Sequence, residues 1–311
     1  MKANLFGLHH ITAISSDVRR NMQFYTQVLG LRFVKKSVNQ DDTGTYHLYY
    51  GNYTGAPGTA LTFFPWAGLP RGRPGKGQSY ATAFSMPSTS LAFWQARLAR
   101  LNVTTFSLES RFNDQVLPFL DHDGLRLELI ATAESDSRPP TPSVEIPAEH
   151  AIRGFHSTTL ALHEAAPTAT VLTGPMGYRL LSESGYRTRY TVGDGGPGTY
   201  VDLLTDPALP RGLSGAGTIH HVAFRTPDRA SQVTARQILL DGALQVSPVI
   251  DRAYFKSIYY REPGGVLFEI ATDQPGFAID EPVETLGSKL SLPPHLEPHR
   301  AEIEASLPKL N

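Results

Sequence analysis

Short runs in which apolar and polar residues alternate recur along the chain, and such alternation is typical of β-strands with one buried face. Residues 8–13 (LHHITA) and 219–224 (IHHVAF) both place a pair of histidines on such a run. Residues 154–159 (GFHSTT) are a third version, and residues 83–87 (AFSMP) repeat the frame of 223–227 (AFRTP) without the histidines. The sequence therefore predicts four repeated units of roughly 65–75 residues, starting near residues 8, 80, 154 and 219.

Within each unit, the pattern predicts one strand, one helix and then three strands. In the first unit, apolar residues at helical spacing predict a helix over residues 17–29, which Ser16 would cap and Gly30 would end. Turn-forming residues separate the strands that follow, which are expected at residues 31–38, 46–50 and 60–64. The fold class is therefore α+β, built from four βαβββ modules.

The units are expected to pair into two domains. The N-terminal domain would cover residues 1–132 and the C-terminal domain residues 151–272, with two modules in each. A polar, proline-rich linker at residues 133–150 would join them, and a second loose stretch at residues 69–79 would separate the first two units. The tail, residues 273–311, should pack as a strap with a short helix near residues 301–307.

Composition narrows the classes of function. With 41% apolar residues, 18% charged residues and a net charge of −1, the chain can bury a large core and has no basic block for nucleic acid or anionic lipid. No stretch approaches the ~20 apolar residues of a membrane span. Because cysteine is absent, disulfides, thiolate metal ligands and a cysteine nucleophile are excluded. We expect a soluble cytoplasmic protein. The sequence does not decide whether it is a monomer or a homo-oligomer.

Three side chains carry the candidate chemistry. His10 and His221 occupy the same position in the first strand of units one and four, and Glu269 lies in the last strand of unit four. A carboxylate inside an apolar strand needs a cation or a hydrogen-bonding partner, for which Arg252 or Arg261 is the ordinary alternative to a metal. Two histidines and one carboxylate match a facial triad that leaves metal positions open and favours Fe(II), with Mn(II) as the alternative.

The whole chain resembles the vicinal oxygen chelate superfamily (glyoxalase, bleomycin resistance protein and extradiol dioxygenase), and within it the hydroquinone-type ring-cleaving dioxygenases. The resemblance is most specific at residues 8–14, 16–25, 219–224 and 257–273. It implies the βαβββ fold and a metal held by His10, His221 and Glu269, so that the site would bridge the two expected domains.

The resemblance also suggests catalytic residues around the metal. His9 and His220 would lie near it without binding it, because adjacent strand residues point to opposite faces. They would support the ligands or exchange protons. Thr12 shares a strand face with His10, and Arg252 and Tyr259 would line the substrate pocket.

A second site is a weaker expectation. His156, Asp202 and Glu128 lie near the repeat-equivalent positions of units three and two, where Ala81 stands in place of a ligand histidine. A remnant held by hydrogen bonds is favoured over a second functional metal site.

The expected function is metal-dependent insertion of dioxygen into a hydroquinone-type or catechol ring, so the partners would be a small aromatic substrate and dioxygen. Two alternatives stay open. A glyoxalase-like isomerase would want a fourth ligand, yet the equivalent strand of unit one offers only Thr62, Phe63 and Phe64. A non-catalytic module that binds aromatic compounds or drugs would need no metal at all.

Overall fold

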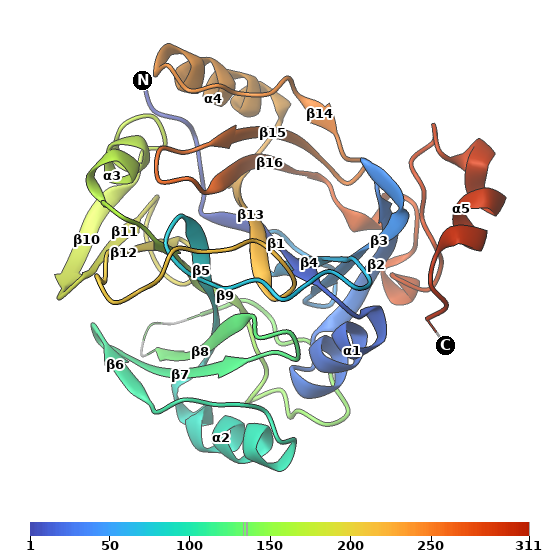
Figure 1. Cartoon of the computed structure of the whole chain (residues 1–311), viewed down its shortest axis with the longest axis horizontal. Helices are drawn as coiled ribbons and strands as arrows, with labels where there is room; N and C mark the ends of the chain where they lie inside the picture. The colour runs from blue at the N-terminus through green and yellow to red at the C-terminus, as the bar shows by residue number, and fades with distance from the viewer. Residues whose placement is uncertain (133, 135, 311) are drawn as a thin grey trace.

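The alternating runs form two curved eight-stranded sheets in the computed structural model, which describes residues 1–132, 134 and 136–310 (Figure 1). From edge to edge, the first sheet consists of β14 (Ile250–Asp251), β15 (Phe255–Arg261), β16 (Leu267–Pro275), β13 (Thr218–Thr226), β1 (Leu8–Ser15), β4 (Ala60–Pro65), β3 (Asp42–Gly51) and β2 (Arg32–Asn39). The second consists of β10 (Arg179–Ser184), β11 (Arg187–Thr191), β12 (Tyr200–Leu204), β9 (Gly154–Ala161), β5 (Gln78–Pro87), β8 (Arg126–Thr132), β7 (Asp114–Leu120) and β6 (Glu109–Arg111).

The sheets combine modules that are far apart in the sequence. β1 pairs antiparallel with β13, so the first and fourth modules share one sheet. β5 pairs antiparallel with β9, so the second and third modules share the other. Each sheet therefore takes strands from both halves of the chain. The described residues between β8 and β9 form no helix or strand, as the proline-rich composition predicts. The domain boundaries themselves stay a prediction.

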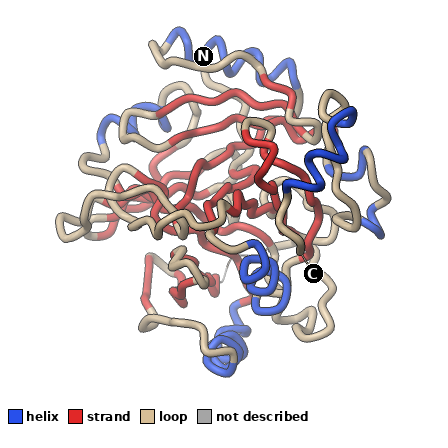
Figure 2. The backbone as a smooth tube through the Cα atoms, turned by 45° about the vertical axis from the view of Figure 1, so that its right-hand side comes forward, coloured by secondary structure: helices blue, strands red, loops and turns tan. Residues whose placement is uncertain are grey.

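Helices lie around the outside of the sheets (Figure 2). They are α1 (Val18–Gln23), the π-helix η1 (Phe24–Val28), η2 (Ser88–Ser90), α2 (Leu91–Arg100), α3 (Ala166–Thr173), α4 (Arg229–Asp241), η3 (Phe277–Ile279), η4 (Val283–Thr285), η5 (Glu297–His299) and α5 (Arg300–Ser306). Within the described residues, no helix is both long and apolar enough to cross a membrane.

The start of the first helix differs from the expectation. Asp17, not Ser16, caps α1, because its carboxylate accepts from the backbone N–H groups of Arg19 and Arg20 at 2.8 and 3.0 Å. The Ser16 hydroxyl instead donates to Asp123 at 2.6 Å, on the loop before β8. Ser16, which the local sequence favoured as the cap, therefore makes a tertiary hydrogen bond instead of capping the helix.

The loose stretch after the first module is held against another crossover. Residues 66–77 lead from β4 to β5, and residues 205–217 lead back from β12 to β13. Backbone N–H groups of Gly72 and Arg73 donate to carbonyl oxygens of the second segment at 2.9 and 2.8 Å. The two crossings between the sheets thus run side by side and brace each other.

The tail packs as a strap, and the structure shows what it covers. It runs beside β2 and β3 at one edge of the first sheet and ends in α5 (Figure 1). The backbone N–H of Ser291 donates to the Lys36 carbonyl on β2 at 2.9 Å. Phe277 packs on Tyr49 of β3 and on Tyr254, with ring centroids 5.1 Å apart in each case. The tail therefore forms part of the wall behind the site described next.

Candidate metal centre

The three predicted ligands come together inside the first sheet. His10 lies on β1, His221 on the adjacent β13, and Glu269 on β16, the neighbour of β13. The Nε2 atoms of the two histidines are 3.3 Å apart, and Glu269 Oε2 lies 3.3 Å from His10 Nε2 and 3.0 Å from His221 Nε2. All three side chains are buried, with exposed fractions of 2, 4 and 0%. Their ligand atoms have the spacing of a group that could hold a metal ion.

The charges in this cluster suit a cation. Burial acts to raise the pKa of Glu269, but the imidazoles of His10 and His221 override it and hold the pKa well below its usual value, so the carboxylate is ionised. Burial also lowers the pKa of His221, against the pull of Glu269, which favours the neutral ring. A carboxylate and neutral imidazoles are the protonation states that bind divalent metals.

The ordinary alternative, an arginine paired with Glu269, is not what the described residues show. The Ser257 hydroxyl donates to Glu269 Oε1, while Oε2 points at the two imidazoles without a hydrogen bond of its own. Arg252 contacts Tyr259 and Asp41 instead, and Arg261 donates to a backbone carbonyl. Two ring nitrogens and a carboxylate oxygen therefore converge on one point, an arrangement of lone pairs that fits a bound cation.

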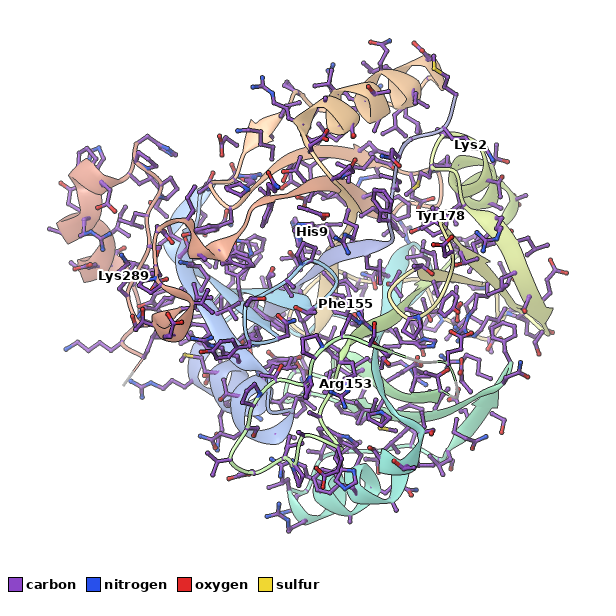
Figure 3. The ribbon with its side chains drawn as sticks, turned by 180° about the vertical axis from the view of Figure 1, so that it is seen from behind. Lys2, His9, Arg153, Phe155, Tyr178 and Lys289 are labelled. Carbon is purple, nitrogen blue, oxygen red and sulfur yellow. The ribbon has the colours of Figure 1, made fainter. Side chains whose placement is uncertain are left out.

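His9 and His220 support the two central histidines in the same way. His9 Nδ1 lies 2.9 Å from His10 Nδ1, and His220 Nδ1 lies 2.8 Å from His221 Nδ1. His9 Nε2 also lies 3.1 Å from the Thr272 carbonyl, inside the molecule (Figure 3). A proton on Nδ1 of His10 and of His221 leaves each Nε2 lone pair facing the centre, which is the tautomer that a ligand needs. Burial lowers the pKa of His9 to about 3, so its ring is neutral and can accept that proton in a hydrogen bond.

A cavity of about 440 Å³ opens onto the cluster. Of the predicted site residues, His10, His220, His221, Arg252 and Tyr259 line it. Arg252 Nε donates to the Tyr259 hydroxyl at 3.2 Å, so these two form one unit of the wall.

Three predicted residues, His9, Thr12 and Glu269, are not among the residues that line this cavity. The Thr12 hydroxyl is 2.7 Å from that of Thr62 on β4 and is fully buried, so its closest described partner is another side chain of the first module.

Several residues that line the cavity were not identified from the sequence. His47 and Tyr49 on β3 line the cavity, as do Trp66 and the β2–β3 turn at residues 39–42. The strand that contains His47 and Tyr49 was predicted, but its sequence pattern did not mark either residue as part of a site. Tyr49 is related by the repeat to Tyr259, because Tyr49 pairs with Thr62 as Tyr259 pairs with Glu269, but this relation is visible only once the strand pairing is known.

That register also defines the position of Thr62. Thr62 lies beside Thr12, two residues after His10, and Glu269 lies beside Ala223, two residues after His221. Thr62 is therefore the structural counterpart of Glu269 in the first module. A hydroxyl that is hydrogen-bonded to Thr12 stands where a fourth, carboxylate ligand would be.

In the second sheet, arginine side chains occupy the place that corresponds to the candidate metal centre of the first sheet. Arg111 donates to both oxygens of Glu128 at 2.6 and 3.0 Å, and Arg189 Nε and Nη2 donate to the two oxygens of Asp202 at 2.8 and 3.1 Å. The strand register puts Ser157, rather than His156, opposite Ala83 in the position that His221 takes opposite Thr12. Fixed guanidinium charges thus neutralise these buried carboxylates, and within the described chain this cluster lacks the spacing of a metal site.

The fold and a three-residue cluster that could hold a metal ion are typical of a large superfamily, and comparisons with known proteins agree. Residues 7–129 match the family model described as the glyoxalase/bleomycin resistance protein/dioxygenase superfamily. The chain belongs to this superfamily.

Its relatives are more specific. MhqO of Bacillus subtilis (strain 168), which bears the name of a ring-cleaving dioxygenase, is 45% identical over 99% of this chain and 97% of its own length. The chlorohydroquinone/hydroquinone 1,2-dioxygenase of Sphingobium indicum is 35% identical over 96% of this chain and 94% of its own.

Solved structures confirm the fold class. A crystal structure from Bacillus subtilis, of a protein named as a dioxygenase, superposes with a TM-score of 0.95 at 43% identity and covers 100% of this chain and 99% of that one. Glyoxalase I from Zea mays superposes with a TM-score of 0.62 at 15% identity, covering 86% and 92% of the two chains, which is a likeness of fold alone.

Proposed function

We propose that the protein is a metal-dependent dioxygenase that cleaves hydroquinone-type aromatic rings, with His10, His221 and Glu269 as the metal ligands. The observation that carries the proposal is the open side of the cluster. His10 and His221 line the cavity, the three ligand atoms are close enough to share one ion, and Thr62 stands in place of a fourth carboxylate. Dioxygen chemistry needs metal positions that the protein leaves open.

Iron(II) is the proposed metal, with Mn(II) as the alternative, because both accept imidazole and carboxylate ligands. When bound, such a metal would position the substrate and dioxygen together and supply the electron path between them. The reaction would insert both oxygen atoms and break a ring carbon–carbon bond. A glyoxalase-like isomerase is disfavoured because Thr62 offers no fourth ligand.

The chain's own residues would bind and orient the ring. Phe64, Trp66 and Phe255 give the cavity aromatic walls that suit a flat ring. The Arg252–Tyr259 pair presents hydrogen-bond donors that would stabilise negative charge on a substrate oxygen. His220, which also lines the cavity, is placed to exchange protons with a ligand there.

Hydroquinones are preferred over catechols in this proposal. A catechol binds a metal through two neighbouring oxygens, whereas a para-hydroquinone reaches it with one and must be oriented by the pocket. The polar groups of the cavity wall, including His47, Arg252 and Tyr259, could do so. The relative from Sphingobium indicum, named for hydroquinone and chlorohydroquinone, supports the same choice.

The test is oxygen consumption by protein purified without air and reconstituted separately with Fe(II) and Mn(II). We expect turnover of methylhydroquinone with a higher kcat/KM than methylcatechol, and one dioxygen consumed per ring opened. Arg252→Ala should lower hydroquinone turnover. A higher kcat/KM for the catechol would overturn the substrate assignment, and activity in metal-free protein would overturn the proposed class.

A further inference from the structure

Two tyrosines face the cavity from equivalent places in the two modules that build it. Tyr49 on β3 pairs with Thr62, and Tyr259 on β15 pairs with Glu269, which is the counterpart of Thr62. Both tyrosines line the cavity. They are therefore related by the internal repeat, and any difference between them comes from their partners.

The partner of Tyr259 is a pure donor. Arg252 Nε lies 3.2 Å from the Tyr259 hydroxyl, and its guanidinium lies over the ring at 5.3 Å from the centroid. A guanidinium has no acceptor, so the tyrosine oxygen must accept this bond. Tyr259 therefore keeps its own proton for another acceptor.

The partner of Tyr49 is an imidazole in a longer chain of hydrogen bonds. The Tyr49 hydroxyl lies 2.7 Å from His47 Nδ1, and His47 Nε2 lies 2.9 Å from the Thr62 hydroxyl. Thr62 in turn lies 2.7 Å from Thr12. Tyr49, Thr62 and Thr12 are at most 4% exposed and His47 is half-buried, so the protein shields most of this chain of bonds from bulk water.

The chemistry of the groups sets the direction of this chain. Burial, with the neighbouring imidazoles, lowers the pKa of His47 well below its usual value, so the ring is neutral and has one donor and one acceptor nitrogen. A phenol is more acidic than an aliphatic alcohol and is the better donor, whereas the alcohol oxygen is the better acceptor. Tyr49 therefore donates to Nδ1, and Nε2–H donates to Thr62. The Tyr49 proton points at His47, and its oxygen lone pairs remain for the cavity.

We propose that Tyr49 is the hydrogen-bond acceptor for the substrate hydroxyl that keeps its proton, and that His47 is the positioning residue that makes it an acceptor. The inference rests on the proposed function and adds a rule of selection to it. The two related tyrosines have opposite polarity: Tyr259 with Arg252 serves an oxygen that carries negative charge, and Tyr49 with His47 serves one that carries a hydrogen. The site thus selects aromatic diols that retain a free hydroxyl over phenols of the same shape without one.

The test compares hydroquinone with 4-methylphenol, in which a methyl group of similar size replaces the second hydroxyl. Affinities are measured by calorimetry on the full-length, metal-loaded protein without oxygen. We expect the native protein to prefer hydroquinone about tenfold, the effect of ~1.4 kcal/mol from one hydrogen bond to a buried acceptor. Tyr49→Phe should remove this preference, mainly through weaker hydroquinone binding.

The repeat supplies the matched control. Tyr259→Phe should weaken both ligands alike and keep the preference for hydroquinone. His47→Phe should lose the preference, whereas His47→Asn should restore part of it, because the asparagine oxygen lies close to the place of Nδ1. If Tyr49→Phe does not fold, the comparison of His47→Phe with His47→Asn gives an independent measurement. The metal content of every variant shows whether the metal centre is intact.

The outcomes separate this inference from the proposed function. An unchanged preference in Tyr49→Phe or His47→Phe, or equal affinities in the native protein, overturns the assignment of Tyr49 even where hydroquinone is still cleaved. If only Tyr259→Phe loses the preference for hydroquinone, Tyr259 and not Tyr49 is the acceptor, and the assignment of Tyr49 is overturned as well. A native, metal-loaded protein that neither binds nor cleaves hydroquinone overturns the inference and the proposed function together.

Discussion

Replacing Thr62 with glutamate would place a second carboxylate opposite Glu269, at the position that the strand register makes equivalent. Thr62 is fully buried and holds hydrogen bonds to His47 and Thr12. Losing two such bonds removes about 1 kcal/mol each. A buried carboxylate without a partner costs about 3–5 kcal/mol more.

In metal-free protein, Thr62→Glu should therefore lower the free energy of unfolding by several kcal/mol. At roughly 2–4 °C per kcal/mol, the value for somewhat shorter chains, a loss of about 5–7 kcal/mol lowers the melting temperature by about 10–28 °C. With a divalent metal bound, the new carboxylate becomes a fourth ligand and most of this loss should be recovered. Oxygen consumption should nevertheless fall, because the added carboxylate occupies one of the metal positions that the three ligands leave open.

The assay is thermal unfolding in chelator and in excess Mn(II), together with oxygen uptake. Thr62→Gln is the matched control, since it has the same length without the charge. We expect the gap in melting temperature between metal-loaded and chelated protein to widen for Thr62→Glu and not for Thr62→Gln. Undiminished oxygen uptake by Thr62→Glu, with an unchanged gap, would refute the idea that Thr62 keeps this side of the centre open.

Three further outcomes are expected. His10→Ala, His221→Ala and Glu269→Ala should each lose most bound metal and all turnover, and near-normal metal content in any one would remove that residue from the ligand set. Arg111→Met should destabilise the protein in urea by about 3 kcal/mol, because Glu128 is only 1% exposed and would lose both hydrogen bonds from Arg111, keeping Arg126 at 3.9 Å, while metal content per folded molecule stays the same. Iron-loaded enzyme should lose activity in peroxide and recover with Fe(II) and a reductant, whereas lasting activity in peroxide would argue for Mn(II).

The strands and the three clustered side chains could be predicted because their signals are local or repeated. Alternation identified β1 and β13, and the double histidines at the same place in both strands pointed to His10 and His221. A carboxylate inside an apolar strand identified Glu269. In each case the residue stands out against the pattern that surrounds it.

The pairing of strands could not be predicted in the same way. Alternation shows that a strand has a buried face, but not which strand lies beside it. β1 and β13 are about two hundred residues apart, so their pairing depends on packing across the whole fold. Tyr49 was missed for a related reason: an aromatic residue in a half-buried strand is ordinary until its cross-strand partner is known. Arg111 and Arg189 became significant only once their carboxylate partners were located.

The tail gives the protein a way to vary its specificity without altering the strands that hold the centre. Phe277 lies 5.1 Å from Tyr49, ring to ring, and belongs to the same buried cluster as Phe255, which lines the cavity. Lys35 on β2, fully buried, anchors this part of the chain through Asp280 at 2.6 Å and through Glu281. Because this segment packs behind the cavity and lies outside the strands that hold the three ligands, substitutions in it would reshape an aromatic pocket from behind. Libraries randomised near Phe277 are therefore a direct route to altered substrate range with the histidine and glutamate positions left intact.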